Sequence, residues 1–330
     1  MSNILGQEET ILRLGAELAQ GRLVHAYLFV GIPGSGRATL ARLLAQASLC
    51  DAKPPPFGGC GRCRQCRLFL AGSHPDFLEL PREESLLRIH LFARRQVSDV
   101  ENVEAPLSEF LHYTPVYALR RVCLVADAER MVEAAANAFL KTLEEPPAAS
   151  LILLTAAERD RLLPTIVSRC RLIHVRPLSA PAVAAELERR GLAAGEKAAA
   201  IAGLAEGALG KALSLAASEA EMEEWQWLEK ALAEFTPTAA VRLAEGLQAR
   251  AAAGGGDSAK RRAAALRLLE RLALAIRRRL RRGLAALPAA NALEAVWRAG
   301  EQLAANVPVD TALAAAALAA VAALQGGERP

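Results

Sequence analysis

The sequence predicts an α/β domain built on a parallel sheet, followed by a region that is entirely helical. Short apolar runs such as Ala26–Val30 and Leu151–Thr155 alternate with longer segments of helical periodicity, which is typical of strands buried on both faces of a sheet. A glycine-rich loop, Gly31–Gly36, joins the first run to a helix. From Glu221 onward the chain consists mostly of alanine–leucine segments, and both residues favour helices.

This alternation predicts the following elements in chain order. The strands are Ala26–Val30, Asp76–Leu80, Arg121–Asp127, Leu151–Thr155 and Leu172–Val175. The helices around them are Glu8–Gln20, Thr39–Leu49, Val97–Leu111, Ala134–Leu143 and Leu162–Val167, and three short ones follow at Ser179–Arg190, Glu196–Ala205 and Gly210–Ala217. The alanine–leucine region gives Trp225–Glu234, Thr238–Ala253, Ser258–Leu287, Ala289–Ala305 and Val309–Leu324, with Gly254–Asp257 as a loop.

Composition limits the class of protein. A length of 330 residues predicts two or three domains, and 52% hydrophobic with only 4% aromatic residues predicts cores of alanine and leucine. The formal net charge of +4 is too small for a chain whose main work is to coat nucleic acid. The first residues show no basic region before an apolar core, and the apolar run Thr311–Leu324 is too short to span a bilayer. We therefore expect a soluble, cytoplasmic protein with no membrane partner.

The glycine loop meets part of the phosphate-loop pattern G-x-x-x-x-G-K-[ST]. Gly31 and Gly36 satisfy the glycine spacing, but Arg37 stands at the lysine position and Ala38 at the hydroxyl position. The lysine contacts the outer phosphates and the hydroxyl holds Mg²⁺. Arginine keeps the charge on a planar group, whereas alanine cannot bind a metal. The loop is therefore either a phosphate site that has lost its metal position or a glycine turn without a ligand.

Two more candidates end strands of the predicted sheet. Asp127 stands where an aspartate meets Mg²⁺ through water, and Thr155 ends a neighbouring apolar run. The position directly after Asp127, where a base would activate water, is Ala128, and Glu129 lies one residue too far along. The candidate nucleotide site therefore consists of Gly31, Gly34, Gly36, Arg37, Asp127 and Thr155. We expect no hydrolysis there, and ATP binding by this chain stays open.

A cysteine cluster, Cys50-x9-Cys60-x2-Cys63-x2-Cys66, interrupts the first domain. In a reducing compartment this spacing predicts a tetrahedral thiolate site, although four incidental cysteines are an alternative. An iron–sulfur cluster of the ferredoxin type needs a fourth cysteine just downstream, where this chain has Leu70. We therefore expect Zn²⁺. Because protein fills all four positions, the metal is structural.

Four stretches of the chain resemble clamp-loader subunits of bacterial DNA polymerase III, and among them the δ′ family of the ring-ATPase (AAA+) superfamily. They are the cysteine insert, His25–Phe29, Asn137–Pro147 and the triplet Ser168-Arg169-Cys170. The match is dense to about residue 175, weaker to about 217 and thin beyond. The resemblance implies an α/β AAA+ core with a zinc insert over 1–175, a small helical lid over 176–217 and an all-α collar, for oligomerisation, over 218–330.

The resemblance also implies a function without hydrolysis by this chain. Motor subunits (γ/τ) have an intact phosphate loop, an Asp-Glu pair and a sensor arginine in the lid, where this chain has Arg37, Ala128 and Gly210. These losses fit a stator-like subunit that supports ATP-dependent loading of the sliding clamp onto primed DNA. Its partners would be γ/τ and δ subunits, with the clamp and primer–template DNA reached through the complex. The alternative is an active, γ/τ-like ATPase that uses Arg37 and Glu129.

Two arginine features complete the expectations. In the family that the chain resembles, the arginine of the Ser-Arg-Cys triplet is an arginine finger, so Arg169 would reach the ATP site of a neighbouring subunit in trans. A cation placed against the γ-phosphate is worth on the order of 10³–10⁵ in rate. The basic run Arg277–Arg282 is either a solvated helix face or a patch that contacts DNA phosphates.

Overall fold

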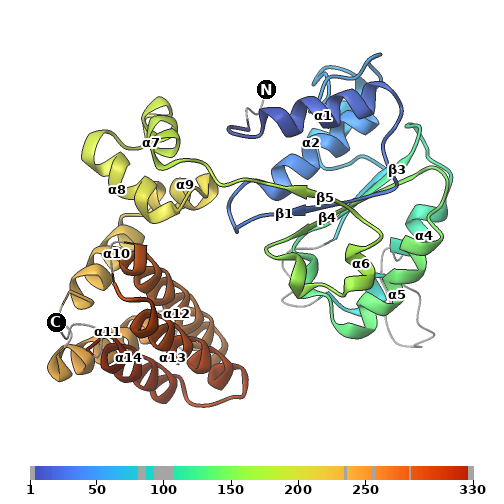
Figure 1. The fold of residues 1–330 in the computed structure, drawn as a ribbon. Coiled ribbons are helices and arrows are strands. Elements are labelled where there is room, and N and C mark those ends of the chain that lie inside the picture. Colours follow the sequence, from blue (N-terminus) through green and yellow to red (C-terminus); the bar gives the residue numbers. More distant parts are fainter. Residues whose placement is uncertain are drawn as a thin grey trace. The chain divides into compact units, whose positions relative to one another are not determined.

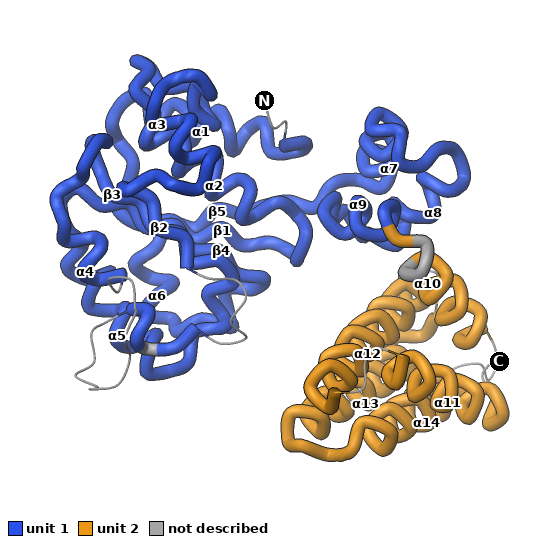
Figure 2. Tube along the Cα trace, turned by 180° about the vertical axis from the view of Figure 1, so that it is seen from behind, with its two compact units in different colours: residues 1–217 blue, residues 218–330 orange. Residues whose placement is uncertain are grey.

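The computed structural model describes residues 4–80, 87–92, 107–233, 236–253, 257–281 and 284–325. The chain divides into two compact units, residues 1–217 and residues 218–330 (Figure 2). No helix within the described ranges is long and apolar enough to cross a membrane. Each unit has a hydrophobic core of its own, and the two are treated separately below.

A five-stranded parallel sheet forms the centre of the first unit (Figure 1). Its strands are β1 (Ala26–Val30), β2 (Phe77–Glu79), β3 (Arg121–Val125), β4 (Ser150–Ala156) and β5 (Arg171–His174). Their order across the sheet is β2-β3-β4-β1-β5. The predicted α/β class is therefore confirmed, and each predicted strand forms, β1 with the predicted bounds and the others with ends that differ by no more than two residues.

Helices cover both faces of this sheet. Around the strands lie α1 (Glu8–Ala19), α2 (Arg37–Leu49), α3 (Arg64–Leu70), α4 (Leu107–His112), α5 (Glu133–Glu144) and α6 (Pro164–Val167). Figure 1 shows α1 and α2 on one face and α4, α5 and α6 on the other. Three further helices end the unit: α7 (Ala180–Arg189), α8 (Gly195–Ala205) and α9 (Leu209–Ala217).

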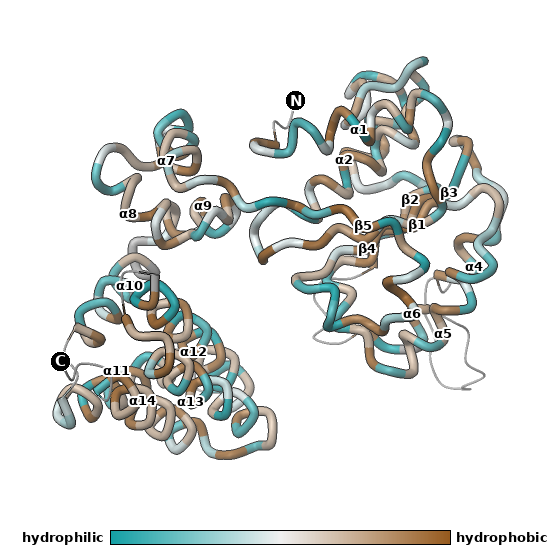
Figure 3. The backbone as a smooth tube through the Cα atoms, viewed as in Figure 1, coloured by the Kyte–Doolittle hydropathy of each residue, from teal (hydrophilic) through white to brown (hydrophobic). Residues whose placement is uncertain are grey.

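Strand alternation explains how the two faces are filled. Successive side chains of a strand point to opposite faces, so both faces of a buried strand must be apolar. In β1, Tyr27 and Phe29 belong to the core shared with α1 and α2, whereas Leu28 belongs to the core shared with α5. Figure 3 shows the resulting hydrophobic runs along β1 and β4.

In the second unit, the regular elements of the described residues are all helices, as its composition predicts. It contains α10 (Glu219–Ala231), α11 (Pro237–Ala253), α12 (Ser258–Arg281), α13 (Ala286–Ala304) and α14 (Val309–Gln325). The buried face of α14 consists mainly of alanine, with Leu313, Val321 and Leu324. Small side chains let helices approach closely. Gly246 in α11 shows this, because a Cβ there would lie 2.2 Å from Cζ2 of Trp227.

Several predicted helix bounds are wrong. The predicted helix Ser258–Leu287 ends at Arg281, and α13 begins at Ala286 rather than Ala289. Gly283 lies between them in the sequence, and glycine is a poor helix former. The helix α10 begins before Trp225, and α3, inside the cysteine insert, was not predicted. Residues 97–106 of the predicted helix Val97–Leu111 and 254–256 of the predicted loop lie outside the described residues.

Candidate functional site

The glycine loop leaves β1 and enters α2 in the conformation that its sequence demands. Gly36 is the N-cap of α2 with φ +96°, and Gly34 has φ +81°, both in the left-handed region that favours glycine. At Gly31 a Cβ would lie 2.5 Å from the carbonyl oxygen of Val175. Strand, glycine loop and helix N-terminus therefore follow one another as the sequence predicts, and phosphate binding by the loop stays a prediction.

A cavity of about 700 Å³ opens beside this loop. Gly34, Gly36, Arg37, Asp127 and Thr155 all line it, together with residues of the helices that end the unit, such as Leu209, Gly210 and Leu213. The structure thus brings five of the six predicted nucleotide-site residues to one cavity. Gly31 does not line the cavity. Its lack of a side chain lets the backbone at Val175, directly after β5, lie close to the start of the loop.

Two residues that line this cavity form an ion pair. Nη2 of Arg37 donates to Oδ1 of Asp127 at 3.1 Å, and the Arg37 side chain is 8% exposed. The backbone N–H of Asp127 donates to Oγ1 of Thr155 at 2.9 Å, and Asp127 has a left-handed φ of +52°. Arg37 therefore engages the carboxylate that the sequence predicts as the magnesium partner.

Two further positions, the candidate base Glu129 and the predicted sensor position Gly210, contact backbone groups of this chain. Oε1 of Glu129 accepts a hydrogen bond of 2.9 Å from the backbone N–H of Ala157, and Glu129 is not among the residues that line the cavity. Gly210, at the predicted sensor position, donates its backbone N–H to the carbonyl oxygen of Gly34 at 2.9 Å. Because residue 210 is glycine and not arginine, its backbone contacts the loop and no positively charged side chain stands at this position.

Arg169 lies elsewhere on the unit and does not line the cavity. Its side chain is 33% exposed. Nη1 donates to the carbonyl oxygen of Thr165 at 2.9 Å and, at 3.4 Å, to Oγ of Ser168. Nη2 donates to Oε1 of Glu144 at 2.7 Å. The guanidinium is thus ordered by its own chain while part of it faces solvent.

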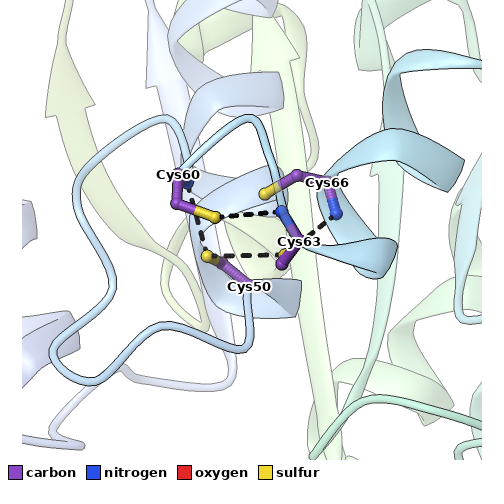
Figure 4. Close-up of side chains that lie close together, drawn as sticks. All are labelled: Cys50, Cys60, Cys63 and Cys66. Carbon is purple, nitrogen blue, oxygen red and sulfur yellow. Dashed lines mark hydrogen bonds between the residues drawn. The ribbon is translucent and has the colours of Figure 1, made fainter.

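The cysteine cluster converges as predicted (Figure 4). The sulfur atoms of Cys50, Cys60, Cys63 and Cys66 all lie within 4.8 Å of one another, and the Cys50–Cys63 pair is 4.0 Å apart. Four thiolates around one zinc ion at Zn–S of about 2.3 Å would be about 3.8 Å apart, so these residues fit a tetrahedral Zn²⁺ site. Such an ion would tie Cys50, at the end of α2, to α3.

Backbone N–H groups donate hydrogen bonds to the sulfur atoms of this cluster. The N–H groups of Cys63 and Cys66 donate to Sγ of Cys60 and Cys63, each at 3.3 Å. Hydrogen bonds from the backbone of Arg62 and Cys63 lower the pKa of Cys60 to about 6, whereas burial raises the pKa of Cys66 to about 12. At Gly59 a Cβ would lie 2.7 Å from Sγ of Cys66, so glycine is required there.

Sequence reasoning missed one buried anion, Asp76. Its carboxylate is fully buried and accepts hydrogen bonds of 2.7–2.9 Å from the backbone N–H groups of Val116, Tyr117 and Ala118. Nη2 of Arg121 lies 3.8 Å from Oδ1. Asp76 therefore fixes the segment that leads into β3. The only signal in the sequence was an acid at the edge of an apolar run.

Two cations of the basic run Arg277–Arg282 have partners inside the second unit. Nη1 of Arg278 lies 2.9 Å from Oε1 of Glu229, and Nη2 of Arg279 lies 3.5 Å from the Glu229 carbonyl oxygen. These contacts join α12 to α10. The side chains of Arg281 and Arg282 lie outside the described residues, and contact of this run with DNA stays a prediction.

The fold and the loop together define an α/β protein built on the phosphate-loop frame. A family model described as "DNA polymerase III, delta subunit" matches residues 6–179, more than half of the chain. The chain belongs to this family, and its resemblance to δ′ subunits of the clamp loader is confirmed.

Several individual proteins are similar to this chain. The delta' subunit of DNA polymerase III from Escherichia coli (strain K12) is 39% identical over 165 residues, which is 50% of this chain and 46% of that protein. The tau subunit from Salmonella typhimurium (strain LT2) is 33% identical over 57% of this chain and 27% of its own length. A gamma subunit-related protein from Thermotoga maritima aligns over 98% of this chain and 100% of its own, with 19% identity and a TM-score of 0.46. The chain spans about half the length of the delta' relative that it matches.

Proposed function

We propose that this chain is the non-hydrolysing, stator-like subunit of a DNA polymerase III clamp loader, a member of the AAA+ superfamily. In this role it supports ATP-dependent loading of the sliding clamp onto primed DNA, beside γ/τ motor subunits and a δ subunit. It completes the ATP site of a neighbouring motor subunit by donating Arg169. The zinc insert is structural, residues 176–217 act as the lid, and 218–330 act as the collar.

The observation that carries this proposal is the ion pair between Arg37 and Asp127. Hydrolysis on a phosphate loop needs a cation on the outer phosphates, a hydroxyl and an aspartate for Mg²⁺, and a group that positions water. Here the cation at 3.1 Å engages the aspartate, and Ala38 offers no hydroxyl. Glu129 accepts from Ala157 instead of lining the cavity. Each group needed for ATP hydrolysis is therefore either missing from the sequence or bonded to another group of this chain.

The surroundings of Arg169 support action on another molecule. An arginine finger must order a long side chain and still present N–H groups to a phosphate. Arg169 meets both needs, because its two Nη atoms are held by Thr165 and Glu144 while a third of the side chain stays exposed. Arg37, by contrast, is enclosed.

An active, γ/τ-like ATPase is the second candidate, favoured by the similarity to tau subunits and by the cavity of about 700 Å³. It requires Arg37 to leave Asp127 and Glu129 to leave Ala157. Arg37 already lines the cavity, but it would have to exchange its partner for a phosphate while Glu129 turned into the cavity, which makes this the weaker candidate.

Phosphate release from ATP separates the two candidates. The purified chain with ATP and Mg²⁺ should release no phosphate above the blank, and steady release would overturn the proposal. A complex assembled with γ/τ and δ subunits should hydrolyse ATP, and Arg169→Ala should lower its turnover. Arg161→Ala is the matched control, because that arginine is 64% exposed and, among the described residues, pairs with the nearby Glu158 alone. It should leave turnover unchanged.

A further inference from the structure

We propose that Glu144 is a positioning residue for Arg169, which holds the guanidinium in the orientation that a neighbouring subunit's phosphate would meet. This inference rests on the proposed function of Arg169 and adds a residue to it. The contact on which it depends is the ion pair from Nη2 of Arg169 to Oε1 of Glu144, at 2.7 Å.

The two residues lie at the ends of separate helices, and both helices are anchored in the core. Glu144 is the last residue of α5, directly after Leu143, which is 2% exposed. Arg169 follows α6, whose Ile166 is fully buried. Because these buried neighbours hold each backbone in place, the Cα atoms of the two residues keep a set separation. The ion pair between the two side chains then restricts the rotation of both before any partner arrives.

The hydrogen bonds around the guanidinium leave one part of it available. A guanidinium carries five N–H groups. One on Nη1 goes to Thr165 and one on Nη2 goes to Glu144, with a weaker contact to Ser168. Among the described residues, the hydrogen bonds of Arg169 use neither Nε nor the second N–H of Nη2, and the side chain is 33% exposed. This arrangement suits a group that must donate two parallel hydrogen bonds to phosphate oxygens without first reorganising.

Preorganisation is the physical benefit. An arginine that is free to rotate must be ordered in the transition state, and misplacement of a catalytic group by about 1 Å can cost on the order of 10²-fold in rate. Glu144 also lowers the net positive charge at this surface, which works against a finger. Ordering of Arg169 raises the rate of hydrolysis and the negative charge of Glu144 lowers it, so removal of the carboxylate shows which effect on the rate is larger. We expect positioning to dominate.

The first test uses the isolated full-length chain. NMR of ¹⁵N-labelled arginine side chains should show slow rotation of the Arg169 Nη groups, with the resonance assigned by its loss in Arg169→Ala. Glu144→Ala should speed this rotation. Glu145→Ala is the matched control. Glu145 is the next residue and carries the same charge, but its side chain forms no ion pair among the described residues. Unchanged rotation in Glu144→Ala would overturn the inference.

The second test uses the assembled complex with γ/τ and δ subunits. Glu144→Ala should lower kcat about tenfold with KM unchanged, and Glu144→Gln, which keeps an acceptor oxygen, should recover most of it. In the Arg169→Ala background neither substitution should have a further effect. An increase in kcat, or a loss that persists without Arg169, would overturn the inference. If Arg169→Ala alone changes nothing, the proposed function fails, whereas the NMR result still decides whether Glu144 orders Arg169.

Discussion

Arg37 and Arg169 are both bound to a carboxylate of their own chain, yet their surroundings are opposite. Arg37 begins α2, is 8% exposed and pairs with Asp127, and both residues line a cavity. Arg169 follows α6, is 33% exposed and pairs with Glu144 at the end of α5. Burial shields the Arg37 side chain from solvent although Asp127 is 38% exposed, whereas water reaches both members of the second pair.

This difference shows that the place of an arginine in the fold decides what it can act on. The charge of Arg37 is paired with Asp127 of the same chain, beside the glycine loop. The contacts of Arg169 order the side chain without enclosing it. Residue type alone would assign both arginines to phosphate chemistry, and only their surroundings distinguish them.

The largest expected effect tests this comparison directly. In the assembled complex, Arg169→Ala should slow hydrolysis at the neighbouring ATP site by about 10³-fold, because a cation that offsets transition-state charge is removed. Arg37→Met, which replaces the buried arginine by an unbranched apolar side chain, should change turnover less than about twofold. Single-turnover phosphate release by complexes with each variant measures both. Equal losses in the two variants would contradict the comparison.

The next effect concerns the stability of the first unit, which contains both arginines and the four-cysteine cluster. Metal analysis should find about one zinc per chain, and Cys66→Ser should reduce metal binding and lower the free energy of unfolding by about 5 kcal/mol, because metal binding is coupled to folding. Denaturant unfolding of both proteins measures the loss. Cys123→Ser probes a buried cysteine outside the cluster and should keep the zinc. Iron with visible absorbance in the purified chain would contradict the metal assignment.

Asp76→Asn should have a smaller effect on the same scaffold, about 3 kcal/mol. The amide cannot accept all of the backbone N–H bonds that the buried carboxylate accepts, and Arg121 loses its counter-charge. Chemical denaturation followed by circular dichroism measures the change. Asp160→Asn, on an 85% exposed side chain, is the control and should leave stability unchanged.

The same carboxylate predicts a pH dependence. Burial opposes ionisation of Asp76, but the backbone N–H groups of Val116, Tyr117 and Ala118, with Arg121, outweigh burial and hold its pKa below the usual value. The stabilisation is therefore fully present above the unfolded pKa of about 3.9 and is lost as the pH falls through the lower folded pKa. The stability difference between wild type and Asp76→Asn should shrink below about pH 4. A constant difference would contradict this.

The smallest effect is again on Arg37. Arg37→Met should change the free energy of unfolding by no more than about 1 kcal/mol, because Asp127 is 38% exposed and water can solvate it once the arginine is gone. Thermal unfolding of the isolated chain measures this. A loss of several kcal/mol would show that the pair is a main support of the unit, which would sharpen its contrast with Arg169.

Local patterns predicted much of this fold, whereas partners distant in the sequence could not be predicted. Strand β1, the glycine loop and α2 follow from apolar alternation and glycine spacing within a few residues. The Arg37–Asp127 pair joins positions 90 residues apart, and no local pattern encodes it. Asp76 binds backbone groups some 40 residues away for the same reason. The break after Arg281 was missed because alanine and leucine continue the helical pattern on both sides.

The contact between Gly34 and Gly210 has a consequence for motion. The two backbones meet through one hydrogen bond of 2.9 Å, and a Cβ on Gly210 would lie only 3.1 Å from the carbonyl oxygen of Gly34. This hydrogen bond joins α9 to the glycine loop within the chain. Under the proposed function, it would hold α9 against the loop while the neighbouring motor subunits hydrolyse ATP.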